Sequence, residues 1–285
     1  AFGFALGYLG GGLLFAVNVL MVLNPEWFGF PDKVAATKVA FLTVSVWWIV
    51  FAIPLFKVVK EPPAPEPNLG LKRATAEGFI QLKKTIKDIA KLKHIWMFLL
   101  AYWLYIDGVN TIMKMAVKYG QALNLADDAL IKALLITQFV GFPAAILFGW
   151  LGQKIGTKIG IFIGIGVYAT VTVFAYFLNS ETEFYILAAI VGLVQGGVQA
   201  LSRSFFSRLI PRDKAGEFFG FYNMLGKFAT ILGPVLMGVT GQLTGNDRMG
   251  VLSLIVLFIA GALLLSQVKE PQRGTMEGQV EEQPG

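Results

Sequence analysis

The 285-residue sequence contains no cysteine and only one histidine, His94. Without thiols, the chain has no disulfide, no thiolate metal site and no cysteine nucleophile. A single imidazole also excludes histidine-based triads and sites built from several histidines. No nucleophile–base pair or other cluster of metal ligands is visible. The sequence therefore disfavours an enzyme and indicates no cofactor or metal.

Charged residues are scarce as well, at 15% of the chain, whereas soluble domains carry about a quarter. Hydrophobic residues make up 55% and the mean hydropathy is +0.65. This composition places the chain among membrane proteins. The net charge of +6 comes mainly from basic residues in short loops between apolar runs. Such residues set the orientation of a membrane protein, so we expect a lipid bilayer around the chain and no nucleic acid partner.

Eight apolar runs approach or exceed the roughly 20 residues that a helix needs to cross a bilayer. They lie near 3–23, 37–58, 95–118, 130–151, 159–178, 184–204, 217–240 and 248–268. Most of the 24 Lys and Arg residues fall in alternate connections, at 57–94, 152–158, 203–216 and 269–285. By the positive-inside rule, these connections and both chain ends are cytoplasmic. The sequence predicts an all-α, multi-pass integral membrane protein with eight transmembrane helices.

The longest connection divides the chain. It begins with KEPPAPEP (60–67), a proline-rich spacer that we expect to be extended. It continues with EGFIQLKKTIKDIAKLKH (77–94), where apolar residues form a helical stripe and lysines lie off it. This pattern is typical of a basic amphipathic helix on the inner membrane surface or of a soluble linker helix. We expect two helices at 1–58, a cytoplasmic linker at 59–94, a six-helix unit at 95–268 and a disordered cytoplasmic tail at 269–285.

Two inner connections carry distinctive patterns of glycine and basic residues. GWLGQKIGTKIG (149–160) resembles the short-loop signature of the major facilitator superfamily, although Gln153 stands at the acidic position of that signature. The residues that match and that we expect to act in conformational change are Gly149, Gly152, Lys154, Gly156 and Lys158. In SRSFFSRLIPRDKAGEFFGFYN (202–223), the corresponding basic residues are Arg203, Arg208 and Arg212.

Four further stretches narrow the resemblance to one branch of that superfamily. They are FLLAYWLYIDGVNTIMKMAVKYG (98–120), GYLGGGLLF (7–15), WWIVFAIPLF (47–56) and GGVQALSRSFFSRLIP (196–211). The chain is similar, up to about residue 270, to the autophagy-related vacuolar amino-acid effluxers and their bacterial relatives. This resemblance implies a twelve-helix fold whose first four helices precede residue 1, so the chain begins without Met as a carboxy-terminal portion. It also implies alternating access, and an amino acid or similar small polar solute as cargo.

Polar residues within the spans are the candidate site, because a charge at mid-bilayer costs about 2.5–3.5 kcal/mol and needs a partner or a water-filled cavity. On a rise of 1.5 Å per residue, Asp107 and Lys227 lie at comparable depth on different helices, so we expect an ion pair between them. Lys114 lies about 10 Å further out, where a lysine can snorkel to the interface. Gly108 would ease local unwinding of the helix next to Asp107. The residues expected to line a polar cavity are Asp107, Asn110, Gln195, Gln199, Asn223 and Lys227.

Two roles are open for this set. In the first, Asp107 is the proton-coupling or amine-binding group and Lys227 its counter-ion or a carboxylate anchor, in a monomeric secondary transporter, a symporter or antiporter, that moves its solute with H⁺. In the second, the residues form only a structural interhelical network, as in a non-transporting receptor or scaffold built on a facilitator fold. The absence of cysteine and of Asn-x-Ser/Thr sequons favours a bacterial cell (inner) membrane.

Overall fold

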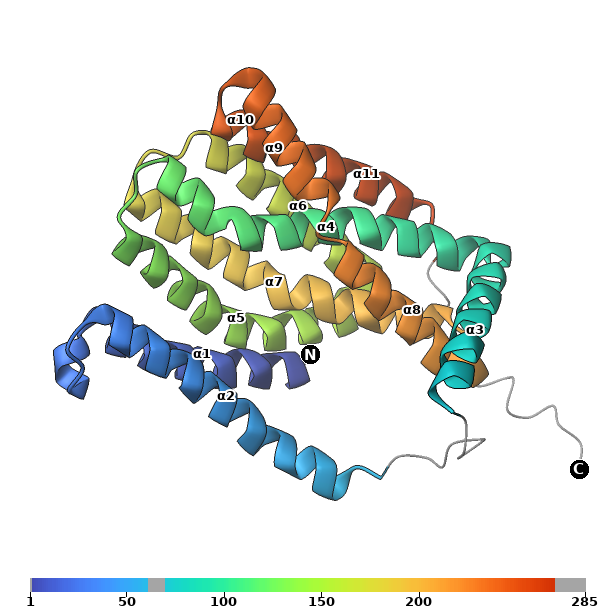
Figure 1. Cartoon of the computed structure of the whole chain (residues 1–285). Helices are drawn as coiled ribbons and strands as arrows, with labels where there is room; N and C mark the ends of the chain where they lie inside the picture. Colours follow the sequence, from blue (N-terminus) through green and yellow to red (C-terminus); the bar gives the residue numbers. More distant parts are fainter. Residues whose placement is uncertain (1, 61–69, 270–285) are drawn as a thin grey trace, which may run out of the picture.

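A computed structural model describes residues 2–60 and 70–269, and the figures show these ranges as ribbons. Residue 1, most of the proline-rich spacer and the expected tail at 270–285 lie outside the described residues. Within the described ranges the chain is helical and contains no β-strand (Figure 1). Eight of its helices or helix pairs are long and apolar enough to cross a membrane, which confirms the predicted fold class.

The first two spans form a hairpin. They are α1 (Phe2–Leu23) and α2 (Lys33–Val58), separated by the short 3₁₀ helix η1 (Pro25–Phe28). Asp32 caps α2 by accepting the backbone N–H of Ala35 at 2.7 Å. The helix α1 packs against α5, whereas Ala36 is the only buried residue of α2. The apolar surface of α2 therefore faces outward from the described bundle (Figure 1).

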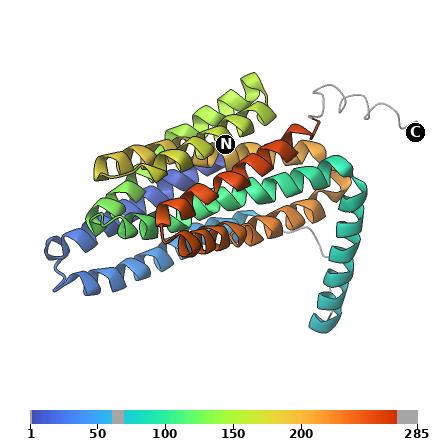
Figure 2. The same ribbon diagram turned by 90° about the horizontal axis from the view of Figure 1, so that it is seen from above.

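The remaining spans form a bundle of nearly parallel and antiparallel helices (Figures 1 and 2). They are α4 (Lys93–Ala122), α5 (Asp127–Ile155), α6 (Thr157–Tyr176), α7 (Glu181–Leu209), the pair α8 (Ala215–Phe228) and α9 (Leu232–Thr244), and the pair α10 (Asp247–Ser253) and α11 (Ile255–Ser266). The short 3₁₀ helix η2 (Arg212–Lys214) precedes α8. At the other end of the bundle, Ser180 and Glu183 form a capping box that fixes where α7 begins.

Small residues bring the helices of this bundle close together. A Cβ added to Gly192 of α7 would lie 2.8 Å from the carbonyl oxygen of Thr137 on α5. Close approach of this kind is the main way in which apolar helices associate in lipid. The centre of the bundle holds stacked aromatic side chains from α4, α7 and α8, including Phe98, Phe206 and Tyr222.

Helix α4 is continuous, which corrects the expectation of unwinding beside Asp107. Its 30 residues run without interruption from Lys93 to Ala122. Gly108 serves packing instead: a Cβ there would lie 2.7 Å from the ring of Phe258 on α11. The glycine therefore lets α11 lie close against α4.

The linker helix α3 (Leu71–Lys91) runs across one end of the bundle, roughly perpendicular to the spans (Figures 1 and 2). Lys214 donates to Asp88 at 2.7 Å, and Thr85 donates to Glu217 at 3.0 Å. The hydrogen bond from Lys214 lowers the pKa of Asp88, and the same bond raises the pKa of Lys214. These contacts join α3 to the start of α8, so this end of the bundle is called the α3 end below.

Candidate solute cavity

The spans contain one pronounced interruption, between α8 and α9. The break lies at Ala229–Ile231, just before Pro234. Proline has no N–H to donate, and its ring collides with the carbonyl four residues earlier, so Pro234 disfavours a continuous helix here. The break leaves N–H groups at the start of α9 and carbonyl groups at the end of α8 without partners inside the helix. Within a bilayer, such groups must find partners in the protein.

Asp107 of α4 supplies the acceptors for the start of α9. Its Oδ2 accepts the backbone N–H of Ile231 at 3.2 Å and of Leu232 at 3.0 Å. Its Oδ1 accepts the N–H of Gly233 at 2.8 Å and the hydroxyl of Thr111 at 3.3 Å. The side chain is fully buried. Because a carboxylate is favoured at the positive N-terminal end of a helix, Asp107 acts as a cap supplied by another span.

Asn110, one turn further along α4, holds the other side of the break. Its Nδ2 donates to the carbonyl oxygen of Ala229 at 2.8 Å. Glycine at 233 permits this contact between spans, because an added Cβ would lie 2.8 Å from Asp107 Oδ1 and still closer to Thr111. Two polar side chains of α4 therefore bind the backbone groups on the two sides of the break, at the end of α8 and at the start of α9.

The expected ion pair between Asp107 and Lys227 is not formed, although both residues are described. The carboxylate points to the start of α9, and the Lys227 side chain lies in a cavity on another side of α4. The depth argument compared positions along the two helices only and left the direction of each side chain open. Packing of α9 against α4 decides that direction.

A polar cavity of about 590 Å³ opens between α4, α7 and α8, with Phe4 of α1 at its edge. This volume lies within the range of about 300–1,000 Å³ that small-molecule sites occupy. Its lining comprises Phe4, Tyr102, Ile106, Asn110, Lys114, Gln199, Arg203, Tyr222, Asn223, Gly226, Lys227 and Thr230. Four of the six residues that the sequence analysis singled out, Asn110, Gln199, Asn223 and Lys227, thus meet in one cavity.

The other two residues of that set lie elsewhere. Asp107 is turned to α9 as described above. Gln195 precedes Gln199 by one turn, does not line the cavity, and its Oε1 is buried without a hydrogen-bond partner within the described ranges. An adjoining groove of about 470 Å³ extends from Gln199 and Arg203 to Gln138 and the start of α1.

Two cations of the cavity had been assigned to other places by sequence. Lys114 was expected to snorkel at the outer interface, and Arg203 was expected to act in an inner connection; the structure also places both in the cavity lining. Arg203 also lies over the ring of Phe219, with 5.1 Å between its Cζ and the ring centroid. A signal was present in the sequence, because Arg203 follows Gln199 at the same spacing that separates Lys227 from Asn223.

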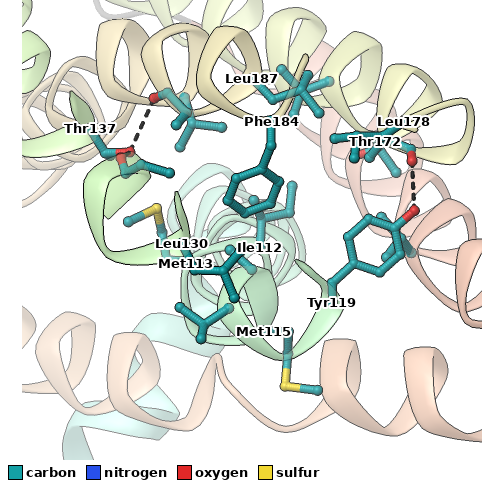
Figure 3. Close-up of a pocket in the computed structure, with 18 of the residues that line it drawn as sticks. Ile112, Met113, Met115, Tyr119, Leu130, Thr137, Thr172, Leu178, Phe184 and Leu187 are labelled. Carbon is teal, nitrogen blue, oxygen red and sulfur yellow. Dashed lines mark hydrogen bonds between the residues drawn. The ribbon is translucent and has the colours of Figure 1, made fainter. Parts of the chain in front are cut away.

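A second cavity, of about 80 Å³, is lined by residues of α4, α5, α6, α7, α9 and α10 (Figure 3). Its walls are aliphatic and aromatic, and its few polar atoms already have partners. Tyr119 donates to the carbonyl of Ala175 at 2.6 Å, and Thr137 donates to that of Ala188 at 3.1 Å (Figure 3). No polar group is left to orient a polar solute, so this space does not match the solute class expected from the sequence.

The predicted inner-connection residues lie at the α3 end, and several tie helices together. Lys158 donates to the carbonyl oxygens of Ser266 and Val268, at 3.0 and 2.7 Å, and so caps the end of α11. Gly156 joins α5 to α6 with φ at +93°, a conformation that favours glycine. Gly152 packs against Leu201, because a Cβ there would collide with that side chain.

The remaining members of the set differ in their contacts. Lys154 lies 4.1 Å from the ring centroid of Trp150, and Gly149 precedes that tryptophan within α5. Arg208 donates to the hydroxyl of Thr157 at 2.6 Å, which links α7 to the start of α6. Arg212 begins η2, and its side chain lies outside the described part of the structure. A role in conformational change stays a prediction for all of these residues.

A family model described as "Vacuole effluxer Atg22 like" matches residues 1–279, nearly the whole chain. The chain belongs to the Atg22-like family. Among curated relatives, the Bacillus subtilis (strain 168) protein named "Uncharacterized MFS-type transporter YxiO" is 41% identical over 271 residues, which cover 94% of this chain and 62% of that protein. The Atg22-like assignment thus agrees with the expected branch of the major facilitator superfamily.

Fungal relatives are more distant. "Autophagy-related protein 22" of Yarrowia lipolytica (strain CLIB 122 / E 150) is 28% identical, over 97% of this chain and 51% of that protein. The protein of the same name from Saccharomyces cerevisiae (strain ATCC 204508 / S288c) is 27% identical, over 97% of this chain and 58% of the relative. The Atg22-like chain described here thus spans between about half and 62% of these relatives.

Proposed function

We propose that this chain is the solute-binding, six-helix unit, with two helices of the other half, of a secondary active transporter that works by alternating access. The observation that carries this proposal is the cavity between α4, α7 and α8. It is lined by amides, hydroxyls and cations in the membrane-spanning part of a protein whose family members are named as transporters and effluxers. The cargo is a small polar solute, with amino acids as the first class to test.

The discontinuous span gives the proposed transport cycle a hinge. Broken helices near a binding site are a recurrent element of secondary transporters, because they can bend where the backbone is not locked by helical hydrogen bonds. Here the hinge at Ala229–Ile231 includes the cavity residue Thr230, follows the cavity residue Lys227, and is held by Asp107 and Asn110. Movement of α9 relative to α8 would therefore change the cavity directly.

The same geometry supports the proposal that the transporter is coupled to protons through Asp107. The side chain of Asp107 accepts three backbone N–H groups and one hydroxyl at this site. A protonated carboxyl group is a weaker acceptor and gives up part of its attraction to the helix N-terminus. Protonation would thus loosen the start of α9, and deprotonation would restore its cap.

Uptake by the full-length protein in proteoliposomes tests this function. A panel of radiolabelled amino acids, with and without a pH gradient, should reveal at least one solute whose uptake responds to the gradient. In Asp107→Asn, uptake should fall and lose its dependence on pH, while a matched variant of an outward cation on the same helix, Lys118→Gln, should behave as the original protein. If Asp107→Asn transports as fast as the original and keeps its pH dependence, the coupling role is wrong.

If none of the solutes is taken up, the result favours the alternative hypothesis, a membrane receptor or scaffold on a facilitator fold. We further propose that the protein is a monomer and that it lies in a bacterial inner membrane. The bacterial relative at 41% identity supports the second of these statements. Detection of the protein in the inner-membrane fraction, and its mass in detergent by light scattering, test these two statements.

A further inference from the structure

The three helices around the polar cavity repeat one arrangement of side chains. Each places an amide and a cation four residues apart on the face that lines the cavity. The pairs are Asn110 and Lys114 on α4, Gln199 and Arg203 on α7, and Asn223 and Lys227 on α8. Residues at this spacing are neighbours on one helix face. The cavity therefore holds three amides and three full positive charges from three separate spans.

None of the residues that line this cavity or the adjoining groove, within the described part of the chain, is an aspartate or glutamate. The nearest acidic residue by sequence is Asp107, one position from the lining residue Ile106. Its carboxylate is fully buried and is occupied by the N–H groups that begin α9. That charge is committed to the helix break, so it does not neutralise the cavity.

The cations themselves lack acidic partners. Lys114 and Lys227 take part in no hydrogen bond or ion pair among the described residues, and the contact of Arg203 that the structure shows is with the ring of Phe219. The side chains of all three cations are exposed where they line the cavity. Cations within membrane spans are kept where a water-filled path or a charged ligand needs them. The most direct compensation is a ligand of opposite charge.

The directions of the helices spread the positive charge along the cavity. Helices α4 and α8 begin at the α3 end, whereas α7 ends there (Figure 1). Lys114 and Lys227 therefore lie further from the α3 end than their amides do, by about 6 Å along each helix. Arg203 lies nearer to the α3 end than Gln199, by the same rise. A solute with negative groups at both of its ends can meet a cation on either side.

We propose that the cavity selects small organic anions, and that it prefers doubly charged solutes, such as dicarboxylates and phosphate monoesters, over zwitterions and cations. The guanidinium of Arg203 suits a planar carboxylate or a phosphate, because its N–H groups form a fixed fork. The amides then bind the remaining hydroxyl or carbonyl groups of the solute. This inference rests on the proposed transport function and assigns the charge of its substrate.

The experiment measures uptake and binding separately with the full-length protein. Five probes cover the charge classes: succinate, L-glutamate, glycerol 3-phosphate, L-alanine and L-arginine. Binding is read as ligand-induced thermal stabilisation in detergent, and uptake is read in proteoliposomes. We expect the dianions and L-glutamate to stabilise the protein at concentrations about tenfold or more below those that L-alanine requires, the scale set by one charge-assisted contact. L-arginine should not stabilise it.

Variants of the three cavity cations test whether the preference for dianions arises in this cavity. Arg203→Gln, Lys114→Gln and Lys227→Gln should each reduce the preference for dianions by about tenfold, and Arg203→Lys should recover part of it. Lys118→Gln is the control, because Lys118 is an exposed cation one turn beyond Lys114 that does not line the cavity. If succinate stabilises the protein more and is taken up faster than glycerol 3-phosphate, the natural ligand is a carboxylate. The opposite order indicates a phosphate ester. Either order supports the inference.

The outcomes also separate the two proposals. Stabilisation by dianions without uptake of any probe would sustain an anion site and overturn the transport function. Uptake that favours L-alanine or L-arginine, or an anion preference that survives all three glutamine variants, would overturn the anion site and leave transport standing. If no probe binds and none is transported, both proposals fail.

Discussion

Asp107 on α4 and Gly233 at the start of α9 lie 126 positions apart in the sequence, and a hydrogen bond of 2.8 Å joins them. The bond exists because Pro234 breaks the span and because glycine lets its backbone approach α4 without a clash. A single contact therefore connects the one fully buried carboxylate of the described spans to the hinge next to the cavity.

Replacing Asp107 should test how much the cap contributes. In Asp107→Ala, three N–H groups of α9 lose their acceptor, and each unsatisfied buried group costs about 1–3 kcal/mol. We expect Asp107→Ala to lower the stability several times more than Asp107→Asn does, because asparagine keeps one oxygen as an acceptor. Thermal unfolding in detergent measures both. A midpoint of Asp107→Ala equal to that of the original protein would show that the carboxylate does not hold the start of α9.

Gly233→Ala should destabilise the same contact from the other side. Its Cβ would press on Thr111 and lie 2.8 Å from Asp107 Oδ1, and overpacking of this kind costs about 1–3 kcal/mol. Gly238→Ala on the same helix is the matched control, because nothing lies within 4 Å of the added Cβ there. It should be neutral or slightly stabilising, since alanine favours helix. Similar unfolding midpoints for the two variants would contradict the described packing.

Lys158 should contribute more to the stability of the fold than Lys154, although both are basic residues of one inner connection. Lys158→Gln loses two charge-assisted hydrogen bonds to the end of α11, and we expect about 1–3 kcal/mol of destabilisation. Lys154→Gln loses an exposed contact with the ring of Trp150, which contributes about 0.5–1 kcal/mol. Thermal unfolding of the two variants provides the comparison, and the reverse order would refute the proposed cap.

The docking of α3 should depend on pH through Asp88 and Lys214. The pKa of Asp88 is lowered by its hydrogen bond with Lys214. The contribution of Asp88 to the docking of α3 is therefore lost as the pH falls through that lowered pKa. The pKa of Lys214 is raised by the same bond, so its contribution is present at neutral pH and lost as pH rises through the raised value. Docking should therefore be complete between about pH 4 and pH 10.

Spin labels can measure this docking, because the chain has no cysteine of its own. A pair of cysteines at the exposed positions Gln81 on α3 and Gly220 on α8 reports the distance between the helices. In Asp88→Asn the distance distribution should broaden at neutral pH, whereas Lys83→Gln, which removes an exposed lysine outside this contact, should leave it narrow. A narrow distribution in Asp88→Asn would show that the ion pair does not hold α3 in place.

The number, order and approximate limits of the spans follow from the sequence, because insertion of a helix into a bilayer depends on its own apolar length. The α3 helix could also be anticipated from its apolar stripe and lysines. Four cavity residues were found because a buried polar group in a span needs a partner or water. Each of these inferences uses local chemistry alone.

Tertiary packing decided the rest. Asp107 could face the cavity or a neighbouring helix at the same depth, and the broken span on α9 determines that it faces the helix. Pro234 disfavours a continuous helix at this point of the sequence, but Pro54 and Pro143 lie inside continuous helices. Only the fold therefore shows where a span breaks and which span supplies the cap. Arg203 and Lys114 likewise became cavity residues because antiparallel helices bring positions 89 residues apart in the sequence to one space. The sequence determined which polar groups enter the membrane, and the packing of spans determined what each of them meets.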